Sequence, residues 1–228
     1  SRQASSQQER ISFRVVSWNI ENLFDTHHDS LKNDHEYLPD AIRHWNYSRY
    51  KKKLADDAIY LERVLCDEAG GWQDQIAASF GGFNRINFNA DGYEVLPVII
   101  SPERKRQLNE NLMMFFTGFT RFSSEVQKAN RETKKDKISQ LRQMYELVDE
   151  AERIVTDQNT SLDEFGRLLD VTWKLKRQTG KAVSTDHIDI LYSKGIEAGA
   201  LGGKLLGAGG GGFLVFYVQP EKQEAVKK

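Results

Sequence analysis

A glycine-rich segment near the C-terminal end is the first candidate for chemistry. Gly202–Gly212 contains a run of four glycines and leads into Phe213–Val218, which is continuously apolar and aromatic. Glycine weakens a strand or helix by roughly 0.5–1 kcal/mol per residue, so a run in front of a buried strand needs a reason of its own. Positive φ angles or a closely approaching ligand would supply one. A flexible turn without function is the alternative interpretation.

The second candidate is a carboxylate, Asp74, which follows the sequence Gly70-Gly71-Trp72-Gln73. Phosphoryl transfer needs an oriented hydroxyl nucleophile, and a carboxylate within hydrogen-bond reach can orient the hydroxyl and accept its proton. The glycine pair would let the backbone come close to a substrate and would end the preceding helix. The alternative is an acidic residue in the first turn of a helix, where it interacts favourably with the helix dipole.

Two further polar segments follow predicted elements. Arg121, Ser123 and Ser124 come after a predicted strand, where the guanidinium could bind an anionic phosphate and the hydroxyls could assist. A surface salt bridge and a helix cap are the alternative. For the basic stretch Trp173–Arg177, a surface role is the favoured interpretation and contact with an anion is the alternative.

Composition sets broad limits. The chain has 228 residues, enough for one large or two small domains, and a net charge of -1, so no polyanion-binding surface is expected. The single cysteine, Cys66, excludes an internal disulfide and agrees with a reducing compartment. No apolar run approaches the ~20 residues of a membrane span. We therefore expect a cytoplasmic protein without a membrane or nucleic-acid partner, whose oligomeric state is left open.

The apolar periodicity predicts a mixture of helices and strands. Because these elements alternate in a strand-helix-helix-strand order, the expected class is α+β. Predicted strands cover residues 12–20, 85–88, 93–98, 112–117 and 213–218, and predicted helices cover 54–66, 76–83, 125–157, 162–178 and 185–198.

The glycine-rich segment resembles the third signature of the GHMP kinases. The sequence that surrounds it is similar to the sequences of the heptose 7-phosphate kinase branch of that family. The resemblance covers about residues 54–228. It implies a ferredoxin-like C-terminal sandwich of an antiparallel sheet and helices. It also implies an ATP- and Mg²⁺-dependent kinase that phosphorylates a hydroxyl of a sugar or sugar phosphate. The family's phosphate-binding signature, P-x-x-x-G-L-G-S, is not found, so the nucleotide site is expected to be incomplete in this chain.

The same resemblance assigns roles to individual residues. Asp74 corresponds to the catalytic carboxylate, and the interpretation requires Asp74 and the glycine run to face a common cavity. Substrate-binding roles fall on Gly71, Gln75, Arg121, Ser123 and Ser124, and a nucleotide or active-site loop on Lys204, Gly207, Ala208, Gly209, Gly210, Gly211 and Gly212.

The N-terminal part resembles a different family. Trp18-Asn19-Ile20 ends a predicted strand in the manner of the endonuclease/exonuclease/phosphatase family, in which Asn19 would help to hold a metal ion. The other metal-binding motifs of that family are not found, and Ser184-Thr185-Asp186-His187 is better interpreted as a helix cap. The alternatives to a kinase are therefore a metal-dependent phosphodiesterase and a non-catalytic remnant.

These two resemblances predict a composite chain. The expected organisation is a disordered arm over residues 1–10, a nuclease-like strand and loop over 11–53, and a GHMP-kinase-like region over 54–228.

Overall fold

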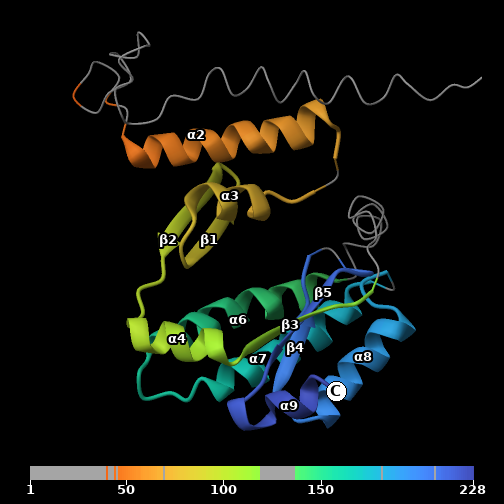
Figure 1. Ribbon diagram of the computed structural model, residues 1–228. Helices are drawn as coiled ribbons and strands as arrows, with labels where there is room; N and C mark the ends of the chain where they lie inside the picture. The colour runs from red at the N-terminus through yellow and green to blue at the C-terminus, as the bar shows by residue number, and fades with distance from the viewer. Residues whose placement is uncertain are drawn as a thin grey trace, which may run out of the picture. The chain divides into compact units, whose positions relative to one another are not determined.

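The computed structural model describes residues 40, 44, 46–68, 70–118, 137–180, 182–207 and 209–228. The chain divides into two compact units, Ser1–Pro97 and Val98–Lys228, and each is described by itself. Figure 1 labels the helices and strands. The predicted arm and the predicted strand over 12–20 lie outside the described residues.

The first unit pairs two helices with a β-hairpin. Asn46 begins the first helix by accepting a hydrogen bond from Arg49 N at 3.0 Å. The helix continues without a break through the predicted boundary between residues 53 and 54. The elements are α2 (Tyr47–Tyr60), a π-helical turn η2 (Leu61–Leu65), α3 (Gln73–Phe80), β1 (Asn84–Asn89) and β2 (Gly92–Pro97), with Asn89 paired to Gly92 across the turn.

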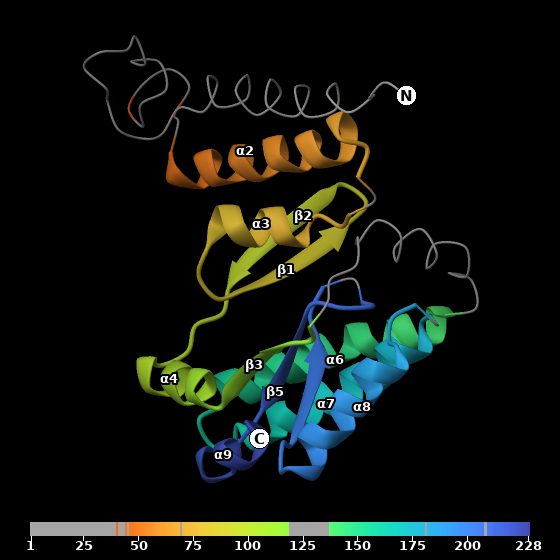
Figure 2. The same ribbon diagram turned by 45° about the vertical axis from the view of Figure 1, so that its right-hand side comes forward.

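In both views of the first unit, α3 and the β1–β2 hairpin lie on the same side of α2 (Figures 1 and 2). Ala55 of α2 and Ile76 of α3 are fully buried. The hairpin is fastened by Tyr93, whose hydroxyl donates to Asp56 Oδ1 at 2.8 Å and whose ring meets Phe80 edge-on. Burial and the Asp56 carboxylate raise the pKa of Tyr93.

The second unit is a three-stranded antiparallel sheet of order β3-β5-β4, with helices packed on it. The predicted apolar strand is its central member and pairs with a strand along each edge. The elements are α4 (Pro102–Glu110), β3 (Leu112–Phe116), α6 (Ile138–Thr156), α7 (Asp163–Gln178), α8 (Asp186–Glu197), β4 (Gly202–Leu205), β5 (Phe213–Tyr217), η4 (Pro220–Lys222) and α9 (Gln223–Val226).

The two faces of β5 contribute to two cores. Leu214 and Phe216 pack in a cluster that includes Trp173 of α7 and Tyr192 of α8. Tyr217 belongs to the second cluster, with Leu108, Val155 and Leu162. The alternation follows from the period of two along a strand. The predicted α+β class, an antiparallel sheet packed with helices, is confirmed.

Two glycines that were expected in a loop belong instead to a strand. Gly202 and Gly203 form the first half of β4, and Lys204 follows them in the same strand. A Cβ on Gly202 would collide with the carbonyl of Gly166 in α7. Gly202 therefore allows helix α7 to lie directly against β4, whereas a Cβ on Gly203 would collide with Val215 O of β5. The loop itself is shorter than predicted.

The structure also tests the predicted helix ends. The Thr185 side chain accepts a hydrogen bond from Ile188 N at 3.3 Å and begins α8, so the cap interpretation of Ser184–His187 is confirmed. Helix α4 was not predicted, although Ser101 and Pro102 at its start are typical of a helix N-terminus. None of the helices within the described ranges has the length and apolar character that crossing a membrane requires.

Candidate functional site

The loop between β4 and β5, residues 206–212, is here called the glycine loop. It is closed by a hydrogen bond from Leu206 N to Phe213 O at 2.8 Å. Positive φ angles occur at Gly207 (76°), Gly209 (116°), Gly210 (78°) and Gly212 (104°). Side chains disfavour these angles, so the expectation that this backbone requires glycine is confirmed. Ala208 lies outside the described residues.

Two contacts hold the glycine loop in place. On one side, Thr117, just after β3, exchanges hydrogen bonds with Gly212: Thr117 N and Oγ1 each donate to Gly212 O at 2.9 Å, and Gly212 N donates to Thr117 Oγ1 at 3.1 Å. On the other side, Gly210 N donates to Val183 O at 3.0 Å. A loop fixed at both sides is preorganised, so binding a ligand there would require little ordering of the chain.

Two lysines accompany the glycine loop. Lys176, in the last turn of α7, donates from Nζ to Gly207 O at 2.6 Å, and Lys204 lies in β4 just before the loop. Burial, followed by repulsion from Lys204, lowers the pKa of Lys176 to about 8. Burial also lowers the pKa of Lys204. Lys176 is partly buried, and the role of its basic stretch stays a prediction.

The other sequence-predicted group lies in the first unit. Asp74 is exposed in the first turn of α3, and the turn before it is fastened by Arg63, whose Nη1 donates to Gly70 O at 2.6 Å. The Gln75 amide donates to the Glu62 carboxylate, and its Oε1 is buried without a hydrogen-bond partner in the described structure. The Asp74 carboxylate is therefore open to solvent, and the turn that precedes it is held in place. A carboxylate that contacts a substrate must be accessible in this way.

The predicted residues thus fall into three sets. Asp74, Gly71 and Gln75 are neighbours in the first unit, and their roles remain predictions. Lys204 and the described glycines of the loop are neighbours in the second unit, where Lys176 joins them. Asn19, Arg121, Ser123, Ser124 and Ala208 lie outside the described residues.

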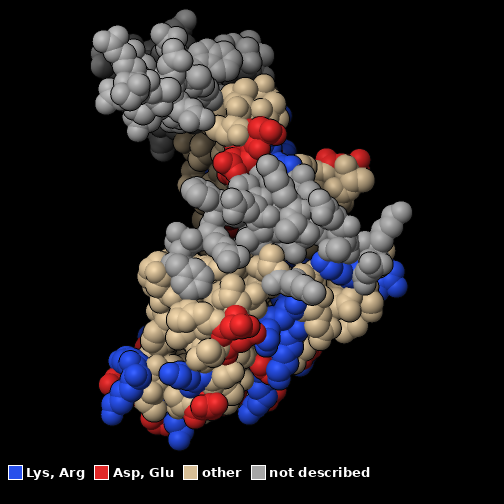
Figure 3. Space-filling view, turned by 90° about the vertical axis from the view of Figure 1, so that its right-hand side faces the viewer, with Lys and Arg blue, Asp and Glu red and all other residues tan. Residues whose placement is uncertain are grey.

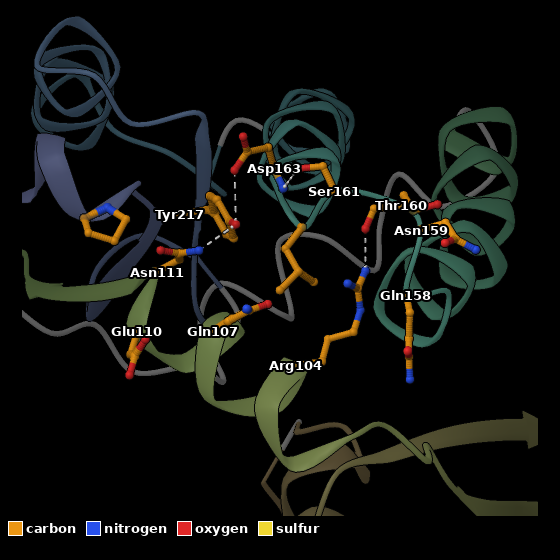
Figure 4. A pocket seen from close by; sticks show the side chains of 12 residues that line it. Arg104, Gln107, Glu110, Asn111, Gln158, Asn159, Thr160, Ser161, Asp163 and Tyr217 are labelled. Carbon is orange, nitrogen blue, oxygen red and sulfur yellow. Dashed lines mark hydrogen bonds between the residues drawn. The ribbon is translucent and has the colours of Figure 1, made fainter.

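A polar pocket of about 440 Å³ lies at the other end of β5, near Tyr217 rather than Phe213 (Figure 4). The Tyr217 hydroxyl accepts from Asn111 Nδ2 at 2.8 Å and donates to Asp163 Oδ1 at 3.2 Å. Burial raises the pKa of Tyr217 to about 12. None of the sequence-predicted site residues lines this pocket.

The cation of the pocket has a structural task. Arg104 is 8% exposed, and its guanidinium donates to the carbonyls of Val155 at 2.8 Å, Ile154 at 2.6 Å and Thr160 at 2.7 Å. Figure 4 shows the Thr160 bond as a dashed line. These carbonyls belong to the end of α6 and the turn after it, where helix carbonyls lack partners within the helix. Arg104 therefore closes α6 and is not available to a ligand as an anion receptor.

Comparison with family models gives two matches. Residues 14–74 match the Endonuclease/Exonuclease/phosphatase family, and residues 140–228 match the family described as GHMP kinases C terminal. The second match includes α7, both lysines, β4, the described residues of the glycine loop and β5.

Individual relatives agree with the match to the GHMP kinases. D-glycero-alpha-D-manno-heptose 7-phosphate kinase of Campylobacter jejuni is 32% identical over 192 residues, covering 80% of this chain and 55% of the relative. Mevalonate kinase of Thermococcus sibiricus is 29% identical over 170 residues, covering 72% and 47%. The crystal structure of Methanococcus jannaschii mevalonate kinase shares the fold, with a TM-score of 0.57, 20% identity and coverage of 78% and 51%. The chain spans about half the length of these relatives.

Proposed function

We propose that this chain, whose residues 140–228 form a GHMP kinase C-terminal domain, belongs to a kinase that transfers a phosphoryl group from ATP to a hydroxyl of a sugar or sugar phosphate. The observation that carries the proposal is the preorganised glycine loop within the matched segment, with Lys176 and Lys204 beside it. A loop of this kind lets bare backbone approach a phosphate, and two cations supply the charge that phosphoryl groups require.

The names of the similar proteins support a sugar phosphate as the substrate class. The Campylobacter jejuni relative carries a name that specifies a heptose 7-phosphate, and it is 32% identical to this chain. We therefore propose a sugar phosphate, with heptose 7-phosphate as the first compound to test. The mevalonate kinases make mevalonate the second.

In the proposed reaction, the substrate hydroxyl oxygen attacks the γ-phosphorus of ATP, the bond from that phosphorus to the β–γ bridging oxygen breaks, and ADP leaves. Asp74 orients the hydroxyl and receives its proton. Mg²⁺ bound to the nucleotide supplies charge neutralisation in such reactions. Among the described residues, no group of three or more His, Cys, Asp or Glu side chains could hold a metal ion, so no step is assigned to a metal held by these residues.

The experiment is an ADP-release assay on the purified chain with ATP, Mg²⁺ and heptose 7-phosphate. Asp74→Asn should lower turnover by roughly 10²–10⁴-fold, the usual contribution of a positioned acid or base. Asp186→Asn is the matched control, because Asp186 is also an exposed acid in the first turn of a helix. Turnover that survives Asp74→Asn within twofold would remove Asp74 from the reaction. Because the nucleotide site is expected to be incomplete in this chain, ligand binding is measured beside turnover. A lack of ADP release together with no rise in melting temperature on adding ATP, Mg²⁺ and heptose 7-phosphate or mevalonate would oppose the proposal itself.

The match over residues 14–74 supports a second candidate, a metal-dependent phosphodiesterase. This candidate predicts hydrolysis of bis(p-nitrophenyl) phosphate with Mg²⁺ or Mn²⁺ and without ATP, and loss of that hydrolysis on Asn19→Ala. If neither phosphodiester hydrolysis nor ADP release occurs, the chain by itself is a non-catalytic remnant.

A further inference from the structure

The polar pocket at the Tyr217 end of β5 has hydrogen-bonding groups that the fold leaves unused. Its volume of about 440 Å³ lies within the range of about 300–1,000 Å³ that is usual for small-ligand sites. The residues that line it come mainly from α4, from the turn that leads into α7 and from the end of β5, and all of them belong to the second unit. The glycine loop meets the other end of β5, at Phe213, so the pocket is separate from the site proposed for phosphoryl transfer.

One side of the pocket is a fixed hydrogen-bonded pair. Tyr217 is 1% exposed, and its hydroxyl accepts from Asn111 Nδ2 at 2.8 Å and donates to Asp163 Oδ1. The first of these bonds uses one of the two N–H groups of the Asn111 amide. None of the residues that the structure describes donates to Asn111 Oδ1. The Asn111 side chain therefore keeps a donor and an acceptor for a ligand, and Tyr217 holds it in place.

Helix α4 supplies further groups. The Gln107 amide makes a long contact of 3.4 Å, from Nε2 to Glu103 Oε1, and no residue in the described part of the chain donates to its Oε1. In Figure 4 this amide points into the pocket, between Tyr217 and Arg104. Arg104 uses Nε and Nη2 for the three carbonyls near the end of α6, so the two N–H groups of Nη1 have no acceptor among the described residues.

The charges of the pocket select the class of ligand. Glu110 and Asp163 contribute carboxylates, which repel an anion, and the cation of the lining, Arg104, is committed to the carbonyls near the end of α6. An ammonium ion has no lone pair with which to accept from Arg104. A side-chain amide presents a donor and an acceptor side by side, and each hydroxyl of a sugar likewise donates and accepts. Neighbouring hydroxyls on a neutral ring therefore match the free groups of Asn111 and Gln107.

We propose that the pocket between α4 and the start of α7 binds a neutral polyhydroxyl compound, with a hexose as the representative of the class. The proposal goes beyond the kinase reaction and does not depend on it, since no residue assigned to phosphoryl transfer lines the pocket. The competing explanation is structural: the hydrogen bonds of Tyr217 only hold the surrounding elements together, and the recess contains water.

The measurement is an NMR titration of the isotope-labelled chain with D-glucose, D-galactose and D-mannose, followed through the backbone amide signals. At least one hexose should shift the signals of Asn111 and Ser161 saturably and leave those of the glycine loop unchanged. Gln107→Leu and Tyr217→Phe should each weaken binding about three- to tenfold through the loss of hydrogen bonds. Gln143→Leu is the matched control, because Gln143 is also an exposed helix residue with a 3.3 Å contact to the residue four positions earlier.

Further probes define the class of ligand and the place where it binds. Glucose 6-phosphate and putrescine should each bind at the pocket more weakly than the best hexose, and equal or tighter binding of either overturns the assignment to a neutral ligand. Loss of hexose binding in Asp74→Asn but not in Gln107→Leu would place the sugar at the proposed kinase site and overturn the inference.

The variants give the remaining outcomes. Gln107 is exposed, so Gln107→Leu decides the matter by itself if Tyr217→Phe does not fold. The inference is overturned if no hexose shifts the pocket signals saturably, or if Gln107→Leu binds the hexose as the unmodified chain does. It is also overturned if Gln143→Leu weakens binding as much as Gln107→Leu. In Figure 3, by contrast, Lys and Arg side chains gather on the side of the second unit that lies to the right in Figure 1, and no part of the proposal uses them.

Discussion

The Lys176 ammonium donates a hydrogen bond to the Gly207 carbonyl, with 2.6 Å between Nζ and O, across 31 positions of the chain. This bond ties the last turn of α7 to the start of the glycine loop. The same ammonium lacks a carboxylate partner among the described residues, so one contact fixes the loop while the charge remains available.

The first prediction concerns pH. The pKa of Lys176 is lowered from 10.5 to about 8, so between these values the unfolded chain holds a proton at this lysine that the folded chain has released. The free energy of unfolding should therefore rise with pH over this window, and the penalty should be complete below pH 8 and absent above pH 10.5. Lys176→Met should remove this part of the pH dependence.

The measurement is urea unfolding of both proteins at pH 7, 8, 9 and 10, because taking the difference cancels groups that titrate equally. Lys204 of β4 also titrates and repels Lys176, whereas Lys174 and Arg177 on α7 are neutralised by Asp170 and Asp189. A stability difference between the two proteins that is flat with pH would contradict the prediction.

The second prediction concerns the anchor of the glycine loop. Thr117 is 4% exposed, and its Oγ1 both donates to Gly212 O and accepts from Gly212 N. Thr117→Val keeps the shape of the side chain but removes the hydroxyl that bonds to the N–H and carbonyl groups of Gly212. The substitution should lower the free energy of unfolding by about 1–3 kcal/mol. Thr117→Ser, which keeps the hydroxyl, should retain more of the stability in the same denaturation experiment. Equal stability of the Val and Ser variants would show that the hydroxyl is dispensable.

The third prediction separates backbone strain from collision. Gly209 and Gly212 both have positive φ, but a Cβ on Gly209 would lie 2.8 Å from Val183 O, whereas one on Gly212 would meet nothing within 4 Å. Gly212→Ala should lower the free energy of unfolding by about 1 kcal/mol through strain. Gly209→Ala should lower it further, because the loop must move away from Val183. Thermal unfolding compares the two variants, and an equal loss of stability in both would argue against the collision.

The fourth prediction concerns Arg104. Its guanidinium satisfies three carbonyls in a buried position, so Arg104→Met should lower the free energy of unfolding by about 3 kcal/mol or more. Arg106 lies on the same helix but is exposed and pairs with Glu103, so Arg106→Met should change stability by only about 0–1 kcal/mol. Chemical denaturation compares the two, and similar losses would mean that the carbonyl bonds contribute little.

Local features were predictable because they depend on neighbouring residues. The Thr185 cap, the β1–β2 hairpin and the apolar strand β5 follow from residue type and spacing over a few positions. The need for glycine between β4 and β5 is of the same kind, since positive φ is a property of single residues.

The sequence by itself determined the α+β class, the glycine loop and the resemblance to two families. Only the tertiary structure decided that Gly202 and Gly203 are strand residues and that Lys176 reaches the glycine loop. The close approach at Gly202 and the bond from Lys176 to Gly207 both depend on how closely α7 packs on β4. The contact between Thr117 and Gly212, which are 95 positions apart, likewise depends on how distant segments pack together. Such contacts arise from the summed packing of distant elements, which no local pattern of residue types contains.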